Sequence, residues 1–279
     1  MFLELITMNY NAHHALNPSE THHIVELIAS LYMVIPLILF FLFYLLSVYY
    51  SNKHYKNWPK YRTLSFASGL FLASVVLLNP VVPLVDGPFV THMIHHLLLG
   101  MLVPLLIVLS APMTLLFRIL NVSVARKLSS FLKSWPFRVY THPIIASALN
   151  IGGLWLLYTS NLYSLMHEND WINGLVHAHL FMAGYLFTVS MIYIDPIYHR
   201  VSFQCRALTL IIALAGHGIL TKYIYANPPI GVEMEQAQQA AKLMYYGGDL
   251  IDAVIIFILC WQWFKATRPR IRMVANQMT

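Results

Sequence analysis

The sequence predicts an all-α fold, an integral membrane bundle of seven helices with the N-terminus outside and the C-terminus inside. Three observations lead to this prediction. Only 10% of the 279 residues are charged and 58% are hydrophobic, whereas a soluble domain has about 25% charged residues. The hydrophobic residues form long uncharged stretches, and the basic residues between them fall on one predicted side of the membrane. This composition excludes an ordinary soluble enzyme and a disordered chain.

The seven helices follow from the apolar stretches in chain order. Residues 27–49, 63–85 and 89–117 contain no Asp, Glu, Lys or Arg, and each stretch exceeds the roughly 20 residues that cross a bilayer. Four further spans are predicted at 139–166, 171–194, 207–226 and 243–264. The sixth span is bounded by Arg206 and Lys222, so its length depends on Lys222 extending its amine toward the interface.

The basic residues give the orientation. With the N-terminus outside, every Lys and Arg except Lys222 and Lys242 falls in an inner segment, which is the usual bias of cytoplasmic loops. The chain then divides into an extracytoplasmic histidine-containing tail, a seven-helix membrane domain and a basic cytoplasmic tail, at 1–26, 27–265 and 266–279.

Charge and cysteine content narrow the partners. The net charge of +6 comes from basic residues in the inner segments, where they set the orientation of the protein in the membrane. The lipid bilayer is therefore an expected partner, and a nucleic acid is not. Cys205 and Cys260 are far apart in the sequence and form no CxxC pair, so metal binding by thiolates is not expected. The sequence is compatible with a homodimer.

The predicted topology places most of the 14 histidines on the outer side, because only His54, His142 and His199 fall on the inner side. The tail contains the pairs 13–14 and 22–23, which could collect metal ions or be plain surface residues. A single histidine within a membrane span is as often a hydrogen-bonded packing residue as a metal ligand. A group of them at similar depth favours a metal site.

Helical spacing defines the candidate ligands. His92 lies three residues before His95 and four before His96, so two of these rings can project from one face of the third span. His177 and His179 are two residues apart and cannot share a face of the fifth span, and His177 is expected closer to the level of His92. Asp249 and Asp252 are expected in the first turns of the seventh span, as an acidic face at this depth. The predicted metal ligands are His92, His96 and His177, with His95, His179, His217, Met93, Met244, Asp249 and Asp252 as further ligands or supports.

The donor types indicate the metal. Imidazole and thioether groups without a thiolate favour copper, and imidazole alone also suits zinc or haem iron. An intramembrane zinc hydrolase, in which zinc activates a water molecule, is therefore an alternative. A haem-binding electron carrier is less favoured, because the inner half offers few histidines. A scaffold that binds no metal is the simplest alternative.

Several sequence blocks form a distinctive set of motifs. The most specific block is 92–99 (HMIHHLLL), which continues through 104–106 (PLL) to 110–112 (SAP). The others are a basic loop with Trp58, Arg62 and Ser65, followed by 79–80 (NP), 175–184 (LVHAHLFMAG) and 244–249 (MYYGGD). Together these blocks resemble the CtaG family of cytochrome c oxidase assembly factors, and the resemblance covers about residues 58–265.

The resemblance implies a multi-pass protein of the bacterial plasma membrane, needed for an active caa3-type cytochrome c oxidase. It implies an assembly factor rather than an enzyme, with oxidase subunits as partners and copper delivery as a plausible role. Copper is thus the expected metal, bound at an outward-facing histidine cluster.

Overall fold

The computed structural model describes residues 18–78 and 87–268, with side chains described from Val34 onward. Over these ranges the regular structure is entirely helical, which confirms the predicted all-α fold class. The helices are α2 (Pro18–His54), α3 (Lys60–Leu78), α4 (Pro88–His95), η2 (His96–Leu102), α5 (Val103–Leu109), α6 (Pro112–Ile119), α7 (Val122–Leu132), α8 (Trp135–Tyr140), α9 (Pro143–Thr159), α10 (Leu162–Glu168), α11 (Asp170–Met191), α12 (Phe203–Ala226) and α13 (Met234–Thr267).

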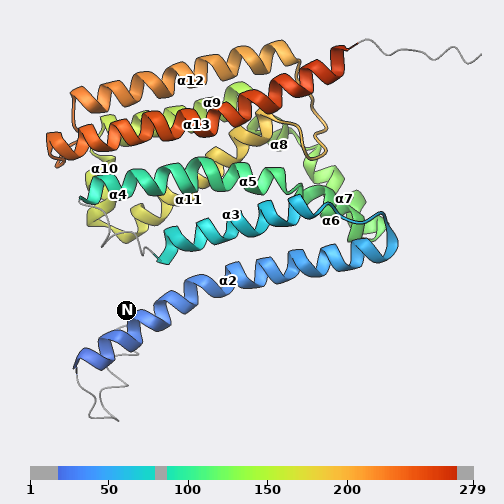
Figure 1. The fold of residues 1–279 in the computed structure, drawn as a ribbon, viewed down its shortest axis with the longest axis horizontal. Coiled ribbons are helices and arrows are strands. Elements are labelled where there is room, and N and C mark those ends of the chain that lie inside the picture. Colours follow the sequence, from blue (N-terminus) through green and yellow to red (C-terminus); the bar gives the residue numbers. More distant parts are fainter. Residues whose placement is uncertain (1–17, 79–86, 269–279) are drawn as a thin grey trace, which may run out of the picture.

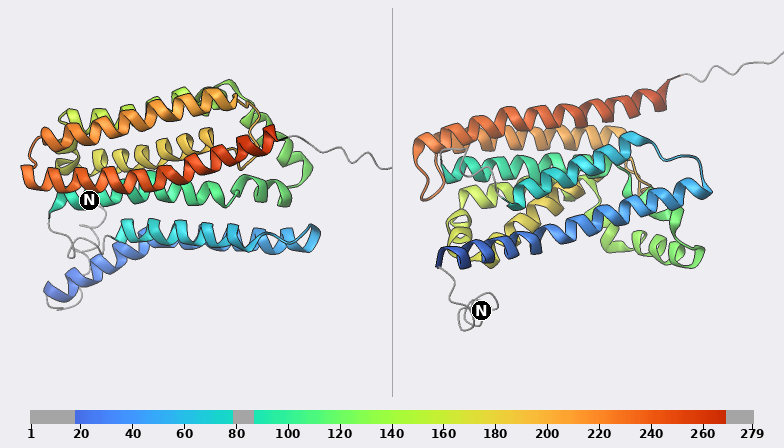
Figure 2. Two further views of the ribbon diagram at one scale, coloured as in Figure 1. Left: turned by 45° about the horizontal axis from the view of Figure 1, so that its top comes forward. Right: turned by 60° about the horizontal axis from the view of Figure 1, so that its bottom comes forward.

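The long helices run side by side and form a bundle (Figure 1). α12 packs against α13 along one side of the bundle, and α2 packs against α3 at the other edge, as further views also show (Figure 2). α4, η2 and α5 follow one another along one line between these pairs. α11 contacts both η2 and α9, so it brings the middle of the chain to the α4–η2 line.

In the described part of the chain, six helical segments are long and apolar enough to cross a membrane, with α4, η2 and α5 counted together as one segment. The number is seven if the bent pair α9 and α10 counts as one span. This agrees with the predicted number. The side of the membrane that each terminus faces stays a prediction. The predicted tails fall largely outside the described residues, which include neither His13 and His14 nor 269–279, and the side chains of His22 and His23 are also outside them.

The predicted bounds of the third and fourth spans were wrong. The third was expected to run to 117, but its helix ends at Leu109, because Ala111 adopts a left-handed conformation with φ 52° and α6 begins at Pro112. The fourth was expected to be continuous, but it bends by 77° between Thr159 and Leu162. Neither break contains a charged residue, so a search for uncharged stretches passed over both.

The seventh helix begins earlier than expected. Hydropathy placed its start near 243, whereas α13 begins at Met234 and includes a polar first segment. Glutamines such as Gln236 and Gln239 are good helix formers, so the helix extends beyond the apolar core. Asp249 and Asp252 therefore lie near the middle of α13, and the prediction that they occupy its first turns was wrong.

A carboxylate from a distant loop caps α6. Ala111 at the N-cap position provides no side-chain acceptor. Asp195, between α11 and α12, accepts hydrogen bonds from the Met113 N–H at 3.1 Å, the Thr114 N–H at 2.7 Å and the Thr114 hydroxyl at 2.6 Å. Burial raises the pKa of Asp195, and these hydrogen bonds oppose the rise. The contact holds the loop before α12 against the start of α6.

We expect Asp195→Ala to destabilise the protein by about 1–3 kcal/mol, because it leaves the N–H groups of Met113 and Thr114 without their acceptor. Thermal unfolding of the purified protein in detergent would measure the loss. Asp195→Asn is the matched control, because its amide oxygen can still accept from one of the donors. An alanine variant as stable as the unsubstituted protein would contradict the capping role.

Candidate metal centre

The His92 cluster consists of His92, His95 and His177. The first two lie one turn apart on α4, and the third lies on α11. The His177 ring lies across from both, with ring centroids 5.9 Å from His92 and 6.3 Å from His95. His92 is buried, whereas His95 and His177 are partly buried. The structure thus brings together three rings from two helices that are far apart in the sequence.

Hydrogen bonds determine which ring nitrogens are free in this cluster. Nδ1 of His177 lies 2.9 Å from the Asn173 carbonyl and must donate to it, which leaves Nε2 as the lone-pair nitrogen. A hydrogen bond of this kind on the other nitrogen is the usual way to orient a metal-binding histidine. Nε2 of His95 is buried and has no partner among the described residues.

The Tyr158 hydroxyl contacts a ring nitrogen of His92, as the Asn173 carbonyl contacts one of His177. The hydroxyl lies 3.2 Å from His92 Nε2 and donates to Met93 Sδ at 3.9 Å. The Tyr158 hydroxyl thus orients the His92 ring through Nε2. The hydroxyl therefore links an imidazole to the thioether of Met93.

Aromatic side chains close this end of the cluster. The Tyr163 ring lies 5.2 Å from the His92 ring and 4.7 Å from the His167 ring. Sequence reasoning missed Tyr158 and Tyr163, which lie on the two sides of the break between α9 and α10. The polar run 159–161 could have signalled this break, but nothing local could place these rings beside His92.

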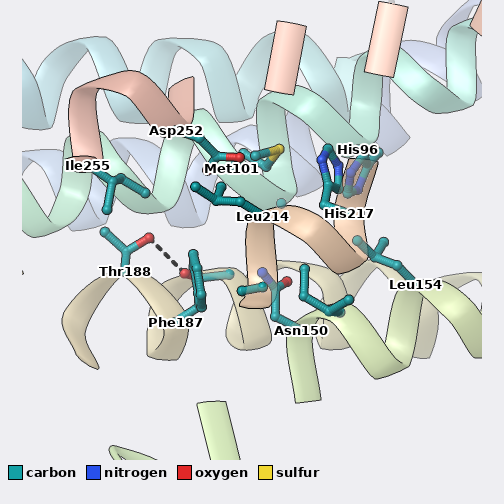
Figure 3. Close-up of a pocket in the computed structure, with 14 residues that line it drawn as sticks. His96, Met101, Asn150, Leu154, Phe187, Thr188, Leu214, His217, Asp252 and Ile255 are labelled. Atoms are coloured by element: carbon teal, nitrogen blue, oxygen red, sulfur yellow. Dashed lines mark hydrogen bonds between the residues drawn. The ribbon is translucent and has the colours of Figure 1, made fainter. Parts of the chain in front are cut away.

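A second group of polar side chains lines a deep cavity of about 20 Å³. His96 of η2 and His217 of α12 lie next to each other there, with ring centroids 6.2 Å apart (Figure 3). The other polar or sulfur-containing lining residues are Met101, Asn150, Thr188 and Asp252. Met101, Asn150 and Thr188 were missed, although an asparagine within an apolar span is a signal that could have singled out Asn150.

The residues that were predicted to form one metal site therefore lie in two separate groups. His96 does not join His92 and His177, although it lies one turn from His92 on the same helix, because its ring packs against His217 of α12. His92 and His95 face α11, whereas His96 faces α12. Spacing along α4 alone could not reveal the division, since it depends on which helices pack on each side.

Three predicted residues belong neither to the histidine rings of the His92 cluster nor to the lining of the cavity. Nε2 of His179 lies 3.3 Å from the Leu149 carbonyl of α9, so this ring turns away from His177. Met244 is fully buried in the hydrophobic core that includes Phe89 and Met93. Asp249 is exposed while Asp252 is buried. The two carboxylates therefore differ in environment, and Asp252 alone lines the cavity.

The donors fit a soft metal ion in chemistry but do not form a closed ligand set. Within residues 18–78 and 87–268, no group of three or more His, Cys, Asp or Glu side chains is arranged to hold a metal ion. The histidines instead face one another in pairs, with several buried nitrogens that have no hydrogen-bond partner in the described part of the chain. Such nitrogens are costly unless a ligand satisfies them.

Membrane-length helices and facing pairs of buried histidines define a multi-pass membrane protein with a polar interior. Residues 42–266 match the family described as cytochrome c oxidase caa3 assembly factor (Caa3_CtaG), and the chain belongs to this family. The membrane-length helices fit the multi-pass membrane architecture that the sequence predicts.

Curated relatives are mycobacterial. The chain is 28% identical to the Mycobacterium bovis protein Mb0105 over 168 residues, which cover 58% of this chain and 25% of the relative. It is 25% identical to the Mycobacterium leprae protein ML1998 over 168 residues, which cover 58% of this chain and 26% of the relative. Both relatives are described as uncharacterized, and the chain spans about a quarter of their length. No solved structure matches the chain.

Proposed function

We propose that this protein takes up copper(I) at the His92 cluster and delivers it to a subunit of cytochrome c oxidase in the bacterial plasma membrane. Membership of the assembly-factor family supports an oxidase partner. The observation that carries the copper part is the convergence of three imidazole rings beside the thioether of Met93.

The donors favour copper(I) over harder ions. Imidazole suits copper and zinc, and thioether sulfur is selective for copper(I). The cysteines offer no competing thiolate at this place, because Cys205 is in the first turn of α12 and Cys260 is exposed near the end of α13. Copper here is the cargo. A site with few protein ligands suits a carrier, because the recipient can add a ligand before the carrier releases the ion.

In this proposal, some residues orient the ligand nitrogens and others exclude water from the cluster. The Asn173 carbonyl holds His177 with Nε2 free, and the Tyr158 hydroxyl orients the His92 ring through Nε2. His95 contributes a nitrogen that has no other use among the described residues. Phe89 and Tyr163 pack edge-to-face against each other beside His92 and limit the access of water from that side.

We expect His177→Ala to lower the copper(I) affinity of the purified, reduced protein by more than the roughly 10–100-fold that follows loss of a supporting residue. Copper content after dialysis against a copper(I) chelator should fall by one equivalent. Oxidase activity should fall in cells whose only copy of the protein carries this substitution.

His179→Ala is the matched control, because it removes a histidine from the same helix whose ring faces α9 instead of α4. It should leave copper content and oxidase activity unchanged. Equal copper in the His177→Ala variant and the unsubstituted protein would contradict the proposal. Unchanged oxidase assembly in that variant would support the scaffold that binds no metal, and zinc in place of copper would support the zinc hydrolase.

A further inference from the structure

We propose that the deep cavity is a second copper(I) site, separate from the His92 cluster, with His96 and His217 as its ligands and Met101 as a neighbouring soft donor. This inference rests on the proposed copper function and extends it, because it gives the cargo two successive positions within one bundle. Five helical segments contribute to the cavity, which lies among η2, α9, α11, α12 and α13.

The first argument is the state of the ring nitrogens. Both nitrogens of His96 and Nε2 of His217 are buried, and none has a hydrogen-bond partner within the described part of the chain. A buried polar atom without a partner costs about 1–3 kcal/mol. Each neutral imidazole offers one lone pair. One metal ion between the rings would satisfy a nitrogen of each.

The second argument is the spacing of the rings. A metal–nitrogen bond of about 2.0–2.1 Å, with the radius of each ring added, places two imidazoles on one ion with centroids roughly 5–6.5 Å apart. The His96 and His217 centroids are 6.2 Å apart. This separation is at the wide end of the range, which corresponds to ligands on nearly opposite sides of the ion. Copper(I) accepts such two-coordinate geometry, whereas zinc prefers four ligands.

The third argument is the size and charge of the cavity. Its volume of about 20 Å³ is slightly above the ~10–15 Å³ that one water molecule needs. It therefore has room for one small ion and little else. Asp252 is 4% exposed, and no Lys or Arg lines the cavity. A copper(I) ion would provide the positive charge that a buried carboxylate requires.

The helix backbones make space for this arrangement. A Cβ atom on Gly248 of α13 would lie 2.6 Å from Cε1 of His217, so the glycine leaves room for the ring. A Cβ atom on Gly100 would lie 3.3 Å from Nδ1 of His96. His217 thus packs against a place where the neighbouring helix has no side chain, and His96 against a glycine four residues later on its own helix.

The position of His96 suggests how the two sites cooperate. His92 and His96 are one turn apart on a continuous helix, and side chains at this spacing have Cβ atoms about 5–6 Å apart. An ion released by His92 can therefore reach His96 with a short movement. His217 and Asp252 lie near the middle of α12 and α13, so the second site is the deeper one and is suited to a membrane-embedded recipient.

The test counts copper(I) ions bound to the purified full-length protein, supplied as the acetonitrile complex against a competing chelator. His217→Leu and His177→Ala should each bind one equivalent less than the unsubstituted protein, and the double variant two less. Leu154→Ala is the control, because it enlarges the same cavity without removing a donor atom. It should keep full stoichiometry.

His217→Cys provides a positive readout that does not depend on loss of binding. The thiolate should keep the second ion, and X-ray absorption at the copper edge should show one added sulfur neighbour. Full stoichiometry in His217→Leu, or no added sulfur in His217→Cys, would overturn the second site. If only His177→Ala loses copper, the second site is wrong and the proposed function stands. If neither variant loses copper, both are wrong.

Discussion

Replacing Arg206 by alanine is expected to destabilise the protein by about 3–5 kcal/mol. Arg206 is 1% exposed, although it lies in the first turn of α12. Its guanidinium lies 4.0 Å from the Tyr193 ring centroid and 4.3 Å from that of Phe203, and it donates to the Met191 carbonyl at 2.7 Å. Cation–π contacts contribute about 0.5–2 kcal/mol each and a charged hydrogen bond about 1.5–3 kcal/mol. The midpoint of thermal unfolding in detergent should fall by roughly 10 °C.

Arg200→Ala is the control, because this nearby arginine is exposed, and its loss should change stability by no more than about 0.5 kcal/mol. Arg206→Lys should recover only part of the loss, because an ammonium group cannot stack on two rings as a planar guanidinium does. If Arg206→Ala unfolds at the same temperature as Arg200→Ala, the buried guanidinium has no structural role.

Replacing Gly184 by alanine is expected to disrupt the centre of the bundle. The added Cβ would overlap the carbonyl oxygen of Gly100 and lie 2.9 Å from its carbonyl carbon. A backbone carbonyl cannot rotate away as a side chain can, so α11 and η2 must separate. Overpacking of this kind costs about 1–3 kcal/mol and sometimes more. Because His177 is on α11 and His96 is on η2, copper binding should weaken together with the stability.

Gly152→Ala is the matched control, since a Cβ at Gly152 of α9 meets no atom within 4 Å. Alanine is the better helix former by roughly 0.5–1 kcal/mol, so this variant should be as stable as the unsubstituted protein or slightly more so. Thermal unfolding and size-exclusion chromatography would compare the two. Equal behaviour of both alanine variants would show that the close approach at Gly184 is not needed.

The sequence predicted the helical fold well because the bilayer imposes a simple rule. Within a membrane every backbone polar group must be satisfied within the segment, so an uncharged stretch of sufficient length becomes a helix. The same rule does not locate breaks inside an apolar stretch. Ala111 and the bend after Thr159 depend on local backbone conformation, which mean hydropathy does not record.

The candidate site was predicted in part. Helical spacing allowed either His95 or His96 to share a face of the helix with His92, and the prediction ranked His96 first, while depth led to His177 in preference to His179. The assignment of His96 to the same site was wrong, because its neighbour is His217 on α12. The partner of a side chain is determined by the packing of distant helices, and one sequence does not contain that information.

The π-helical segment η2 has a consequence for changes in chain length. A π turn contains one residue more than an α turn, so the segment is equivalent to an α-helix with one inserted residue. Deleting a residue of α4 or α5 would turn one end of the span by about 100° relative to the other. Deleting a residue of η2, such as Leu99, would instead allow α-helical hydrogen bonding and keep the ends nearly aligned. η2 is therefore the place in the described part of this span that can absorb a one-residue deletion without turning His92 and His95 away from α11.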